Sequence, residues 1–536
     1  MKQRIRYIAE QKDKKIMRIF DILPATLLAE FSTQEHERLK HLTCTGISSD
    51  TRSLTKGDFY IGGDGHQSTG AAFLSQAFEK GACGALISQK GAQTLKTESL
   101  KILSESFPIW ISKENPQSII GLIASRMYPH VPEMVMAVTG TNGKTSVSFF
   151  AYQMMEKLGF PAAFLGTIGL WVRGEKMLWS ELEACSLTSP DAITLHKTLS
   201  KLSQAGIQAV SLEASSHGLD QGRLKGIHVK AAGFTNFSQD HLDYHETMER
   251  YFEAKCRLFG DILERQGWAV LNADSEEYPL LHTITQKRAH RLFSYGWEGR
   301  DLRLLALTPF EEFLELEVDF WGERATLPLP LIGDYQVHNV LCALGLVAGS
   351  LGLMPTDKKM IQRCLETVKT LKSPPGRLEF VGKTPTKARI YVDYAHTPDA
   401  FERVLDTLRP FTKGDLWILF GCGGDRDREK RPLMGKIAYE KADYCVITDD
   451  NPRFEDPDII RAQIQMHIPM PSSRVFVSPN REEAIDQTLE KLKEGDVLLL
   501  AGKGHEQGQI MRDRIEPFND KTITLSLLHK MRKRFV

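Results

Sequence analysis

The 536-residue chain is several times longer than the ~100–200 residues of a typical domain, so we expect about three domains. Its 42% hydrophobic and 25% charged residues are typical of a water-soluble globular protein, and the 68 basic and 68 acidic residues balance, which argues against nucleic acid or an anionic membrane as partner. No stretch approaches the ~20 apolar residues of a membrane span, and eight scattered cysteines without a CxxC pair predict reduced thiols in a cytoplasmic protein.

Changes in composition divide the chain into four segments. Residues 1–17 are basic and lack the apolar core of a secretory signal, so we expect a disordered tail or an upstream start codon before Met17. Predicted strands at 58–61 and 83–87 flank a predicted helix at 71–80, which indicates a small mixed α/β domain over 18–132. A central domain is expected over 133–372. A third domain is expected over 373–536, and it begins with the Ser-Pro-Pro-Gly break.

A glycine-rich loop at the start of the central domain carries the strongest signal. A short apolar strand at 134–138 leads into the loop, and a helical pattern at 144–158 follows it. Backbone N–H groups of such a loop can surround phosphate oxygens, while a lysine adds charge and a hydroxyl reaches Mg²⁺. Val138 stands where the strict P-loop pattern has glycine, so the loop is a shortened variant. The ATP-binding residues predicted here are Thr139, Gly140, Thr141, Asn142, Gly143, Lys144, Thr145 and Ser146.

Two candidate magnesium ligands come next along the chain. Glu213 ends a predicted buried strand, and His241 follows a second one at 230–234. Magnesium prefers oxygen ligands, so the pattern favours Glu213 more than His241, for which a surface-loop histidine is the plain alternative. Lys255 lies in an amphipathic helical pattern at 248–259 and, taken alone, is expected to be a solvated lysine.

The third segment repeats one pattern. Short apolar runs lead directly into polar or glycine residues at 390–392, 416–420, 444–447 and 497–500. Helical patterns between them, such as 398–408, suit parallel crossovers. In open α/β sheets, ligands bind at the carboxyl ends of the strands, so this segment is predicted to be an α/β domain with a binding crevice.

Ten motifs in this order resemble those of the Mur ligases, and the resemblance spans residues 46–520. They are GTNGKTS, SLEASSHGLDQGR, FTNFSQDHLDYH, YFEAKCRLF, GDYQVHN, PPGRLE, VDYAHTPDA, FGCGGDRDREKRPLMG, DNPRFEDP and AGKGHE. The resemblance implies three α/β domains: a small mixed N-terminal domain for the UDP end of the substrate, a central parallel-sheet P-loop ATPase-like domain, and a C-terminal Rossmann-like domain for the amino acid.

The closest resemblance is to the members that add the third residue of the peptidoglycan stem peptide. It implies an ATP-dependent ligase, acting through an acyl phosphate, that joins meso-2,6-diaminopimelate to the D-Glu γ-carboxylate of UDP-N-acetylmuramoyl-L-Ala-D-Glu. Such an enzyme uses ATP and two Mg²⁺ ions, is cytoplasmic, does not insert into membranes or bind nucleic acid, and is expected to be a monomer.

The resemblance also assigns roles residue by residue. The catalytic and metal-binding groups it implies are Lys144, Thr145, Glu213, His241 and Lys255, the last as a carbamate (N6-carboxylysine). Further nucleotide contacts are Asn339, Arg377 and Asp393. Around the UDP-substrate it places Ser49, Thr51, His66, Gln67, Ser68, Thr188, Ser189, Ser215 and Arg223. Around diaminopimelate it places Arg426, Asp450, Asn451, Arg453, Gly502 and Glu506.

In the ligases that this chain resembles, arginine at the position of Arg453 accompanies meso-diaminopimelate, whereas lysine-adding members lack it. Diaminopimelate differs from lysine by one extra carboxylate, which a guanidinium can bind through two hydrogen bonds. A lysine-adding ligase of the same family is therefore the alternative. A folylpolyglutamate synthase-like ligase shares the GTNGKT loop but is not expected to combine it with the DNPR and GKGHE motifs. A non-catalytic relative is disfavoured because Lys144, Glu213, His241 and Lys255 are all present.

Overall fold

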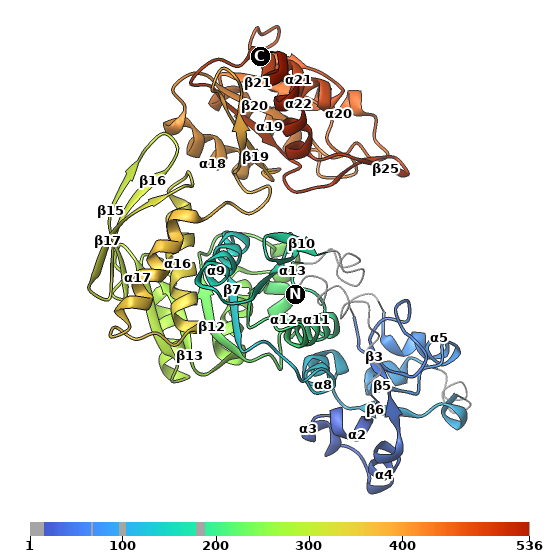
Figure 1. Ribbon diagram of the computed structural model, residues 1–536. Coiled ribbons are helices and arrows are strands. Elements are labelled where there is room, and N and C mark those ends of the chain that lie inside the picture. The colour runs from blue at the N-terminus through green and yellow to red at the C-terminus, as the bar shows by residue number, and fades with distance from the viewer. Residues whose placement is uncertain (1–15, 66–67, 96–102, 178–187, 535–536) are drawn as a thin grey trace. The chain divides into compact units, whose positions relative to one another are not determined.

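The computed structural model describes residues 16–65, 68–95, 103–177 and 188–534 (Figure 1). The chain divides into two compact units, and each is described by itself. Unit 1 takes in the chain up to Arg303 together with Phe320–Glu323 and Leu341–Cys364. Unit 2 takes in Leu304–Asp319, Arg324–Val340 and the chain from Leu365 onward. Most of the expected basic tail, and the predicted site residues His66 and Gln67, lie outside the described residues.

The first part of unit 1 contains a four-stranded parallel sheet, drawn in blue in Figure 1. Its order is β3 (Gly46–Ser48), β4 (Asp58–Gly62), β5 (Gly84–Ser88) and β6 (Ile109–Ser112). The expected helix between β4 and β5 is present as the turn η1 (Gly70–Phe73) and α5 (Leu74–Glu79). The remaining elements are β1 (Met17–Arg18), α2 (Ile19–Ile22), α3 (Ala25–Leu28), α4 (Thr33–His41), β2 (Thr43–Cys44), α6 (Gln89–Gln93), η2 (Pro116–Ser118) and α8 (Ile120–Met127).

A second, larger sheet forms the centre of unit 1. The first eight of its eleven strands run in the order β10 (Glu175–Met177), β9 (Gly169–Val172), β8 (Ala162–Gly166), β11 (Ala209–Glu213), β7 (Met134–Thr139), β12 (Val229–Phe234), β13 (Leu263–Asn272) and β14 (Arg291–Gly296). From β8 to β14 every pairing is parallel, whereas β9 and β10, at one edge of the sheet, pair antiparallel. Every residue of β7, β8 and β11 is buried, as expected of a parallel sheet covered on both faces.

The register of this sheet aligns the strand ends that matter for function. Glu213 of β11 pairs with Val138 of β7, and Phe234 of β12 pairs with Thr139. The carboxyl ends of β11 and β12 therefore flank the start of the phosphate loop. This follows from the parallel pairing, because strands running the same way end at the same edge.

Helices and loops complete unit 1. Its helical elements are α9 (Lys144–Leu158), α11 (Ala192–Gln204), α12 (Ser216–Asp220), α13 (Leu242–His245), α14 (Met248–Arg257), the π-helical turn η3 (Leu258–Ile262) and α15 (Tyr278–Lys287). Five elements have residues in both units: the helices α16 (Tyr335–Ser350) and α17 (Lys358–Thr367) and the strands β15 (Leu302–Pro309), β16 (Leu314–Phe320) and β17 (Glu323–Leu329).

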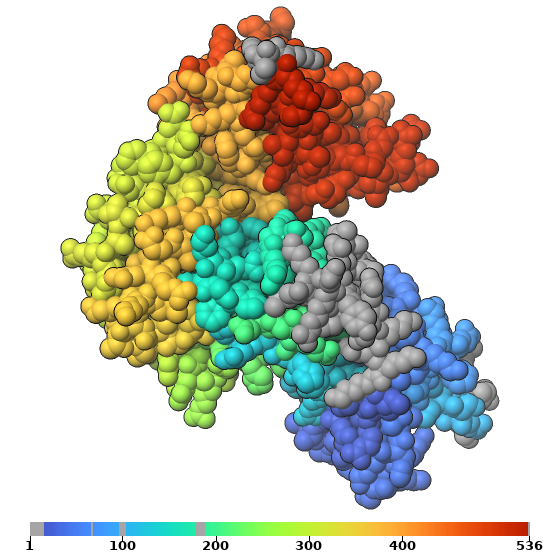
Figure 2. Space-filling view, in the orientation of Figure 1, coloured from blue at the N-terminus to red at the C-terminus, as the bar shows by residue number. Residues whose placement is uncertain are grey.

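Unit 2 contains a six-stranded sheet in the order β18 (Glu379–Lys383), β19 (Arg389–Asp393), β23 (Val497–Ala501), β20 (Leu416–Phe420), β21 (Tyr444–Ile447) and β22 (Val475–Val477). All pairings except β18–β19 are parallel. Its helical elements are η4 (Val368–Thr370), α18 (Pro398–Leu408), η5 (Arg409–Phe411), α19 (Lys430–Lys441), α20 (Pro457–Gln465), α21 (Arg481–Lys491) and α22 (Asp520–Arg534). A separate hairpin, β24 (Gly508–Met511) and β25 (Arg514–Pro517), projects from the surface of the unit (Figure 2).

The fold class expected from the sequence is confirmed. The chain is α/β, with a small N-terminal sheet, a mainly parallel central sheet that carries the phosphate loop, and a doubly wound C-terminal sheet. The four apolar runs predicted in the third segment are β19, β20, β21 and β23, and all belong to one parallel array. Among the helices of the described part of the chain, none is both long and apolar enough to cross a membrane.

Candidate active site

The phosphate loop joins β7 to α9 and adopts a backbone that requires glycine at two positions. Gly140 has φ +144°, and a Cβ built there would lie 1.9 Å from the Thr235 hydroxyl. Gly143 has φ +85° and caps the N-terminus of α9. The first N–H groups of this 15-residue helix, whose partial positive charge attracts anions, therefore open onto the loop.

The loop that follows β12 holds the phosphate loop in place. The N–H of Thr141 donates to the carbonyl of Asn236 at 2.8 Å, and the N–H of Asn142 donates to the Asn236 side-chain oxygen at 2.9 Å. The Thr235 hydroxyl donates to the Asn142 carbonyl at 2.6 Å. Thr235 and Asn236 were not among the predicted site residues. Their position directly after a strand beside β7 was the available signal.

Two lysines meet at the phosphate loop. The Lys144 ammonium lies 2.9 Å from the Gly140 carbonyl oxygen, and Lys255 of α14 donates to the same oxygen at 2.7 Å. Lys255 is 1% exposed, so the expectation of a solvated lysine is wrong. Burial, reinforced by the nearby Lys144 cation, lowers the pKa of Lys255 to about 6. An amine with this pKa is largely unprotonated at neutral pH.

Glu213 lies at the end of β11, 3% exposed, and accepts hydrogen bonds from two neighbouring segments. The Thr145 hydroxyl donates to it at 2.9 Å. Thr167, just beyond β8, donates from its N–H at 2.8 Å and its hydroxyl at 3.0 Å. Burial raises the pKa of Glu213, against the opposing effect of these donors and of Lys144. Thr167 was also not among the site residues predicted from the sequence.

His241 is exposed and has φ +51°, at the start of α13. Its ring centroid lies 4.9 Å from that of His217 and 6.1 Å from that of Tyr251. The Lys255 nitrogen lies 4.2 Å from the centre of the same Tyr251 ring. The two predicted metal-binding residues His241 and Lys255 therefore both lie against Tyr251.

The residues of this region fit magnesium. Among the described residues, no three His, Cys, Asp or Glu side chains are gathered in a ready-made metal cluster. The donors beside the phosphate loop are instead a buried carboxylate and a threonine hydroxyl, Glu213 and Thr145. Magnesium binds through few protein oxygens and completes its shell with water and substrate phosphates, so this sparse oxygen set suits it.

The four residues expected around the muramoyl-dipeptide are brought together beside Glu213. The Ser189 hydroxyl donates to the Glu213 carbonyl at 2.8 Å and lies 3.1 Å from the Ser215 hydroxyl. The Arg223 guanidinium donates to the Ser189 carbonyl at 2.6 Å. Thr188 accepts a hydrogen bond of 3.2 Å from Thr167, which itself donates to Glu213.

The predicted uridine contacts that the structure describes, Ser49, Thr51 and Ser68, lie in loops that join elements of the small N-terminal domain. Ser49 directly follows β3, and Ser68 is exposed. Thr51 is buried, and its hydroxyl already donates to Gln76 at 2.6 Å. The Thr51 hydroxyl therefore has a hydrogen-bond partner within the protein in this structure.

The remaining predicted nucleotide contacts belong to unit 2, whereas the phosphate loop belongs to unit 1. Asn339 is 6% exposed and donates to Gln336 at 3.0 Å. Asp393 accepts from the N–H groups of Leu378 and Ala395 at 2.6 and 2.7 Å. Burial raises the pKa of Asp393, and the Arg377 cation opposes that shift.

The Asp-Asn-Pro-Arg segment after β21 is tied to the β24–β25 hairpin. Arg453 has φ +52°, and its N–H donates to the Ile510 carbonyl at 3.1 Å. Its guanidinium donates to the Gly424 carbonyl at 2.7 Å, in the same loop as the exposed Arg426. A cavity of about 570 Å³ lies here, lined by Pro452, Arg453, Phe454, Glu455, Asp456, Pro457, Met511, Arg512, Asp513 and Arg514.

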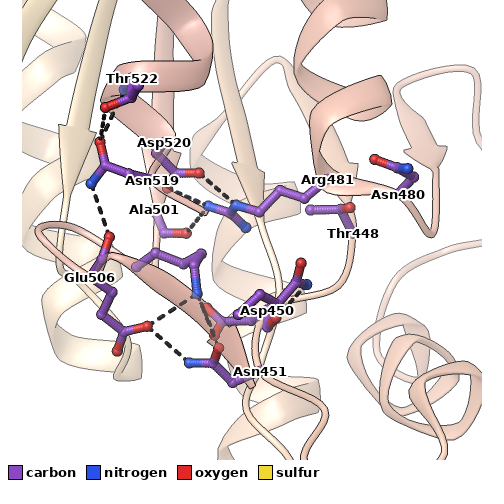
Figure 3. Close-up of polar contacts among 12 residues, drawn as sticks. Thr448, Asp450, Asn451, Asn480, Arg481, Ala501, Glu506, Asn519, Asp520 and Thr522 are labelled. Atoms are coloured by element: carbon purple, nitrogen blue, oxygen red, sulfur yellow. Dashed lines mark hydrogen bonds and ion pairs between the residues drawn. The ribbon is translucent and has the colours of Figure 1, made fainter. Parts of the chain in front are cut away.

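The other predicted amino-acid contacts are gathered at the ends of β21 and β23. The Asn451 amide donates to Glu506 at 2.9 Å (Figure 3). Gly502 has φ +104°, and a Cβ there would lie 2.8 Å from an Asp450 carboxylate oxygen, so only glycine allows this approach. A fully buried lysine, Lys503, lies among these residues and was not predicted from the sequence.

Comparisons with known proteins identify the family of this chain. Residues 138–347 match the Mur ligase middle domain, and residues 376–504 match the Mur ligase glutamate ligase domain. A relative from Caulobacter vibrioides, named UDP-N-acetylmuramoyl-L-alanyl-D-glutamate–2,6-diaminopimelate ligase, is 42% identical over 483 residues. That match covers 90% of this chain and 95% of the relative.

Solved structures give the same result. A structure of a UDP-N-acetylmuramoyl-L-alanyl-D-glutamate–2,6-diaminopimelate ligase superposes with a TM-score of 0.69 at 29% identity, covering 97% of this chain and 100% of the other. Folylpolyglutamate synthase of Mycobacterium tuberculosis, complexed with ADP and AMPPCP, shares the fold with a TM-score of 0.56 at 17% identity, covering 72% of this chain and 91% of that one. On this evidence, the chain belongs to the Mur ligase family.

Proposed function

We propose that the chain is an ATP-dependent ligase that joins meso-2,6-diaminopimelate to the D-Glu γ-carboxylate of UDP-N-acetylmuramoyl-L-Ala-D-Glu. The observation that carries the proposal is the pair of lysines on one phosphate-loop carbonyl, with a buried carboxylate beside them. This arrangement suits transfer of a phosphoryl group to a carboxylate, and the relatives named above carry out the corresponding ligation.

The reaction has two steps. A carboxylate oxygen of the substrate attacks the γ-phosphorus of ATP, the bond to ADP breaks, and an acyl phosphate results. The amine of diaminopimelate then attacks the acyl carbon, phosphate leaves, and the nitrogen loses a proton. Lys144 and the N-terminus of α9 would hold the phosphates, since positioning and charge stabilisation supply most of the catalysis of phosphoryl transfer.

Magnesium belongs to this proposal as a cofactor. Thr145 and Glu213 would hold one ion, and His241 with carbamylated Lys255 a second. Bound there, Mg²⁺ would neutralise the charge that develops on the phosphate oxygens. The buried Lys255 amine supports the carbamate: its nitrogen adds to CO₂, an N–C bond forms, and one proton is released. This converts a neutral amine beside Lys144 into an anion.

Ser189, Ser215 and Arg223 would orient the dipeptide end of the substrate next to Glu213. Arg453 would bind the carboxylate that distinguishes diaminopimelate from lysine, and Glu506 an ammonium. A lysine-adding ligase remains the second candidate, favoured only if Arg453 does not contact substrate. The folylpolyglutamate synthase likeness extends to the fold alone and supports no folate activity.

The test is release of phosphate from ATP by the purified protein with Mg²⁺ and UDP-N-acetylmuramoyl-L-Ala-D-Glu. Three reactions are compared: meso-diaminopimelate, L-lysine and no amino acid. Release only with diaminopimelate, together with the tripeptide mass, is the expected result. Release only with lysine would leave a ligase but overturn the role of Arg453. A folded, ATP-binding protein that is inactive in all three reactions would overturn the proposal.

A further inference from the structure

Lys503 is a lysine whose side chain has no exposed surface, in the loop after β23. Its ammonium donates to the Asn451 side-chain oxygen at 3.1 Å, to Glu506 Oε2 at 3.1 Å and to the Gly508 carbonyl at 2.9 Å. Asp450 lies 3.9 Å away. Three of these four neighbours are residues assigned above to diaminopimelate, yet Lys503 itself has no assigned role.

The acceptors of Lys503 come from two loops, its own loop between β23 and β24 and the loop after β21. Asn451 follows β21, Glu506 follows β23, and Gly508 begins β24. Figure 3 shows Asp450, Asn451 and Glu506 gathered together. One ammonium therefore joins the loops at the carboxyl ends of two strands. The strands do not need this contact, because β20, β21 and β23 are already held by their own backbone ladders.

A second buried pair fixes the backbone next to Lys503. Arg481 and Asp520 are both fully buried and form two hydrogen bonds, at 2.7 and 2.8 Å. Arg481 also donates to the carbonyl of Ala501, the last residue of β23, at 3.0 Å (Figure 3). The backbone is thus anchored at Ala501, two residues before Lys503, which restricts where the lysine side chain can start.

The contacts also orient Glu506. The Lys503 ammonium and the Asn451 amide both donate to the same oxygen, Oε2. In Figure 3 the other oxygen of the Glu506 carboxylate points away from Asn451. A carboxylate side chain that is one-third exposed is thereby fixed with one oxygen inward and the other turned away from its protein partners.

We propose that Lys503 is a positioning residue for the amino-acid substrate: it locks Asn451 and Glu506 into the arrangement that receives the ammonium-bearing end of diaminopimelate. This inference rests on the proposed function. Burying a lysine cation costs desolvation energy that an apolar side chain would avoid. That cost is understandable where the cation aligns a binding carboxylate, since preorganised groups bind without reordering at the moment of association.

The test compares Lys503→Met and Lys503→Gln with Lys441→Met. Methionine keeps the unbranched stem of lysine without the charge, and glutamine keeps an N–H donor. Lys441 is the matched control, because its ammonium also contacts two carboxylates in unit 2, Glu402 and Asp406, but no predicted substrate residue. For each variant, KM is measured for diaminopimelate, ATP and the UDP-substrate.

We expect Lys503→Met to raise KM for diaminopimelate at least tenfold and to leave the other two KM values within twofold. Lys503→Gln should lie between Lys503→Met and wild type, and Lys441→Met should match wild type. In a Glu506→Gln background the effect of Lys503→Met should fall below threefold, because the two residues act as one unit.

Equal changes in all three KM values, or full additivity with Glu506→Gln, would overturn the positioning role and leave Lys503 as a structural lysine. If Lys503→Met fails to fold, Lys503→Gln decides: an unchanged KM for diaminopimelate overturns the inference. A wild-type protein inactive with diaminopimelate would instead refute the proposed function, so the two failures are distinct.

Discussion

Lys144 and Lys255 donate to one acceptor, the carbonyl oxygen of Gly140, although they belong to different helices 111 positions apart in the chain. Two ammonium cations this close repel each other, and Lys255 is the buried partner. Burial and the Lys144 charge together lower the pKa of Lys255 to about 6. The surroundings of Lys255 therefore favour its neutral, nucleophilic amine over the ammonium form.

The first prediction concerns pH and stability. In the unfolded chain Lys255 has a pKa of about 10.4, so between about pH 6 and 10 the unfolded state binds more protons than the folded one. The penalty for burying Lys255 is absent above the unfolded pKa, grows as pH falls, and is complete below the folded pKa. In CO₂-free buffer, the stability of wild type relative to Lys255→Met should rise by about 1.4 kcal/mol from pH 7 to 8.

Urea unfolding of both proteins at pH 7, 7.5 and 8 measures this difference. Methionine cannot titrate, so all other groups cancel in the comparison. Parallel stability curves for the two proteins would mean that Lys255 keeps an ordinary pKa in the folded state, and would remove the basis for a reactive amine.

The second prediction concerns the carbamate. Lys255→Ala should lower kcat by about 100-fold or more, because an anion expected to hold a metal is lost. A small carboxylic acid added to the assay should restore part of the activity by occupying the vacated space. Arg257→Ala, on the same helix with an exposed side chain paired to Asp220, is the control and should retain wild-type kcat. Wild-type turnover by Lys255→Ala without additive would exclude the carbamate.

Lys255 also shows where prediction from sequence ends. The strand ends, the phosphate loop and the helix 144–158 follow from local patterns, and the structure confirms them. Lys255 sits in an ordinary amphipathic helix, and its residues alone predict a solvated side chain. Its burial depends on Gly140, 115 residues away, and no local pattern carries that contact.

Lys503 and Thr167 also make contacts that no local pattern predicts. The GKGHE motif drew attention to Gly502 and Glu506, but the partners of Lys503 include Asn451, 52 residues earlier. Thr167 reaches Glu213 because β8 and β11 are neighbours in the sheet. The order of the strands along the chain does not reveal that they are neighbours. The residue types at the strand ends could be predicted. The contacts between them could not, because tertiary packing decides which distant residues come together.

The third prediction uses the tight packing around Glu213. A Cβ built on Gly166 would lie 2.1 Å from Glu213 Oε1, so Gly166→Ala must displace the carboxylate. We expect activity to fall by tenfold or more and the Mg²⁺ concentration for half-maximal rate to rise. Gly260→Ala is the matched control, because nothing lies within 4 Å of its added Cβ. A Mg²⁺ titration of phosphate release measures both variants. An unchanged Mg²⁺ requirement in Gly166→Ala would argue against a metal at Glu213.

The fourth prediction concerns the choice of amino acid. Arg453 is held by Gly424 and by the β24–β25 hairpin, so its guanidinium is in a defined position at the cavity. Arg453→Ala should lower kcat/KM for diaminopimelate by about 100-fold, roughly 2.7 kcal/mol, because a bidentate contact to a carboxylate is lost. kcat/KM for lysine, which lacks that carboxylate, should change little, so the ratio of the two collapses.

Arg514→Ala is the control for this experiment. Arg514 lines the same cavity and carries the same charge, but it pairs with Glu516 and is 71% exposed. General attraction between a basic surface and an anionic amino acid could instead govern selectivity. Both variants would then lose selectivity for diaminopimelate over lysine to a similar extent, and added salt would have the same effect. If Arg453 binds the distal carboxylate directly, only Arg453→Ala changes the diaminopimelate-to-lysine ratio, and Arg453→Lys recovers it only in part, because an ammonium cannot form the paired hydrogen bonds of a guanidinium.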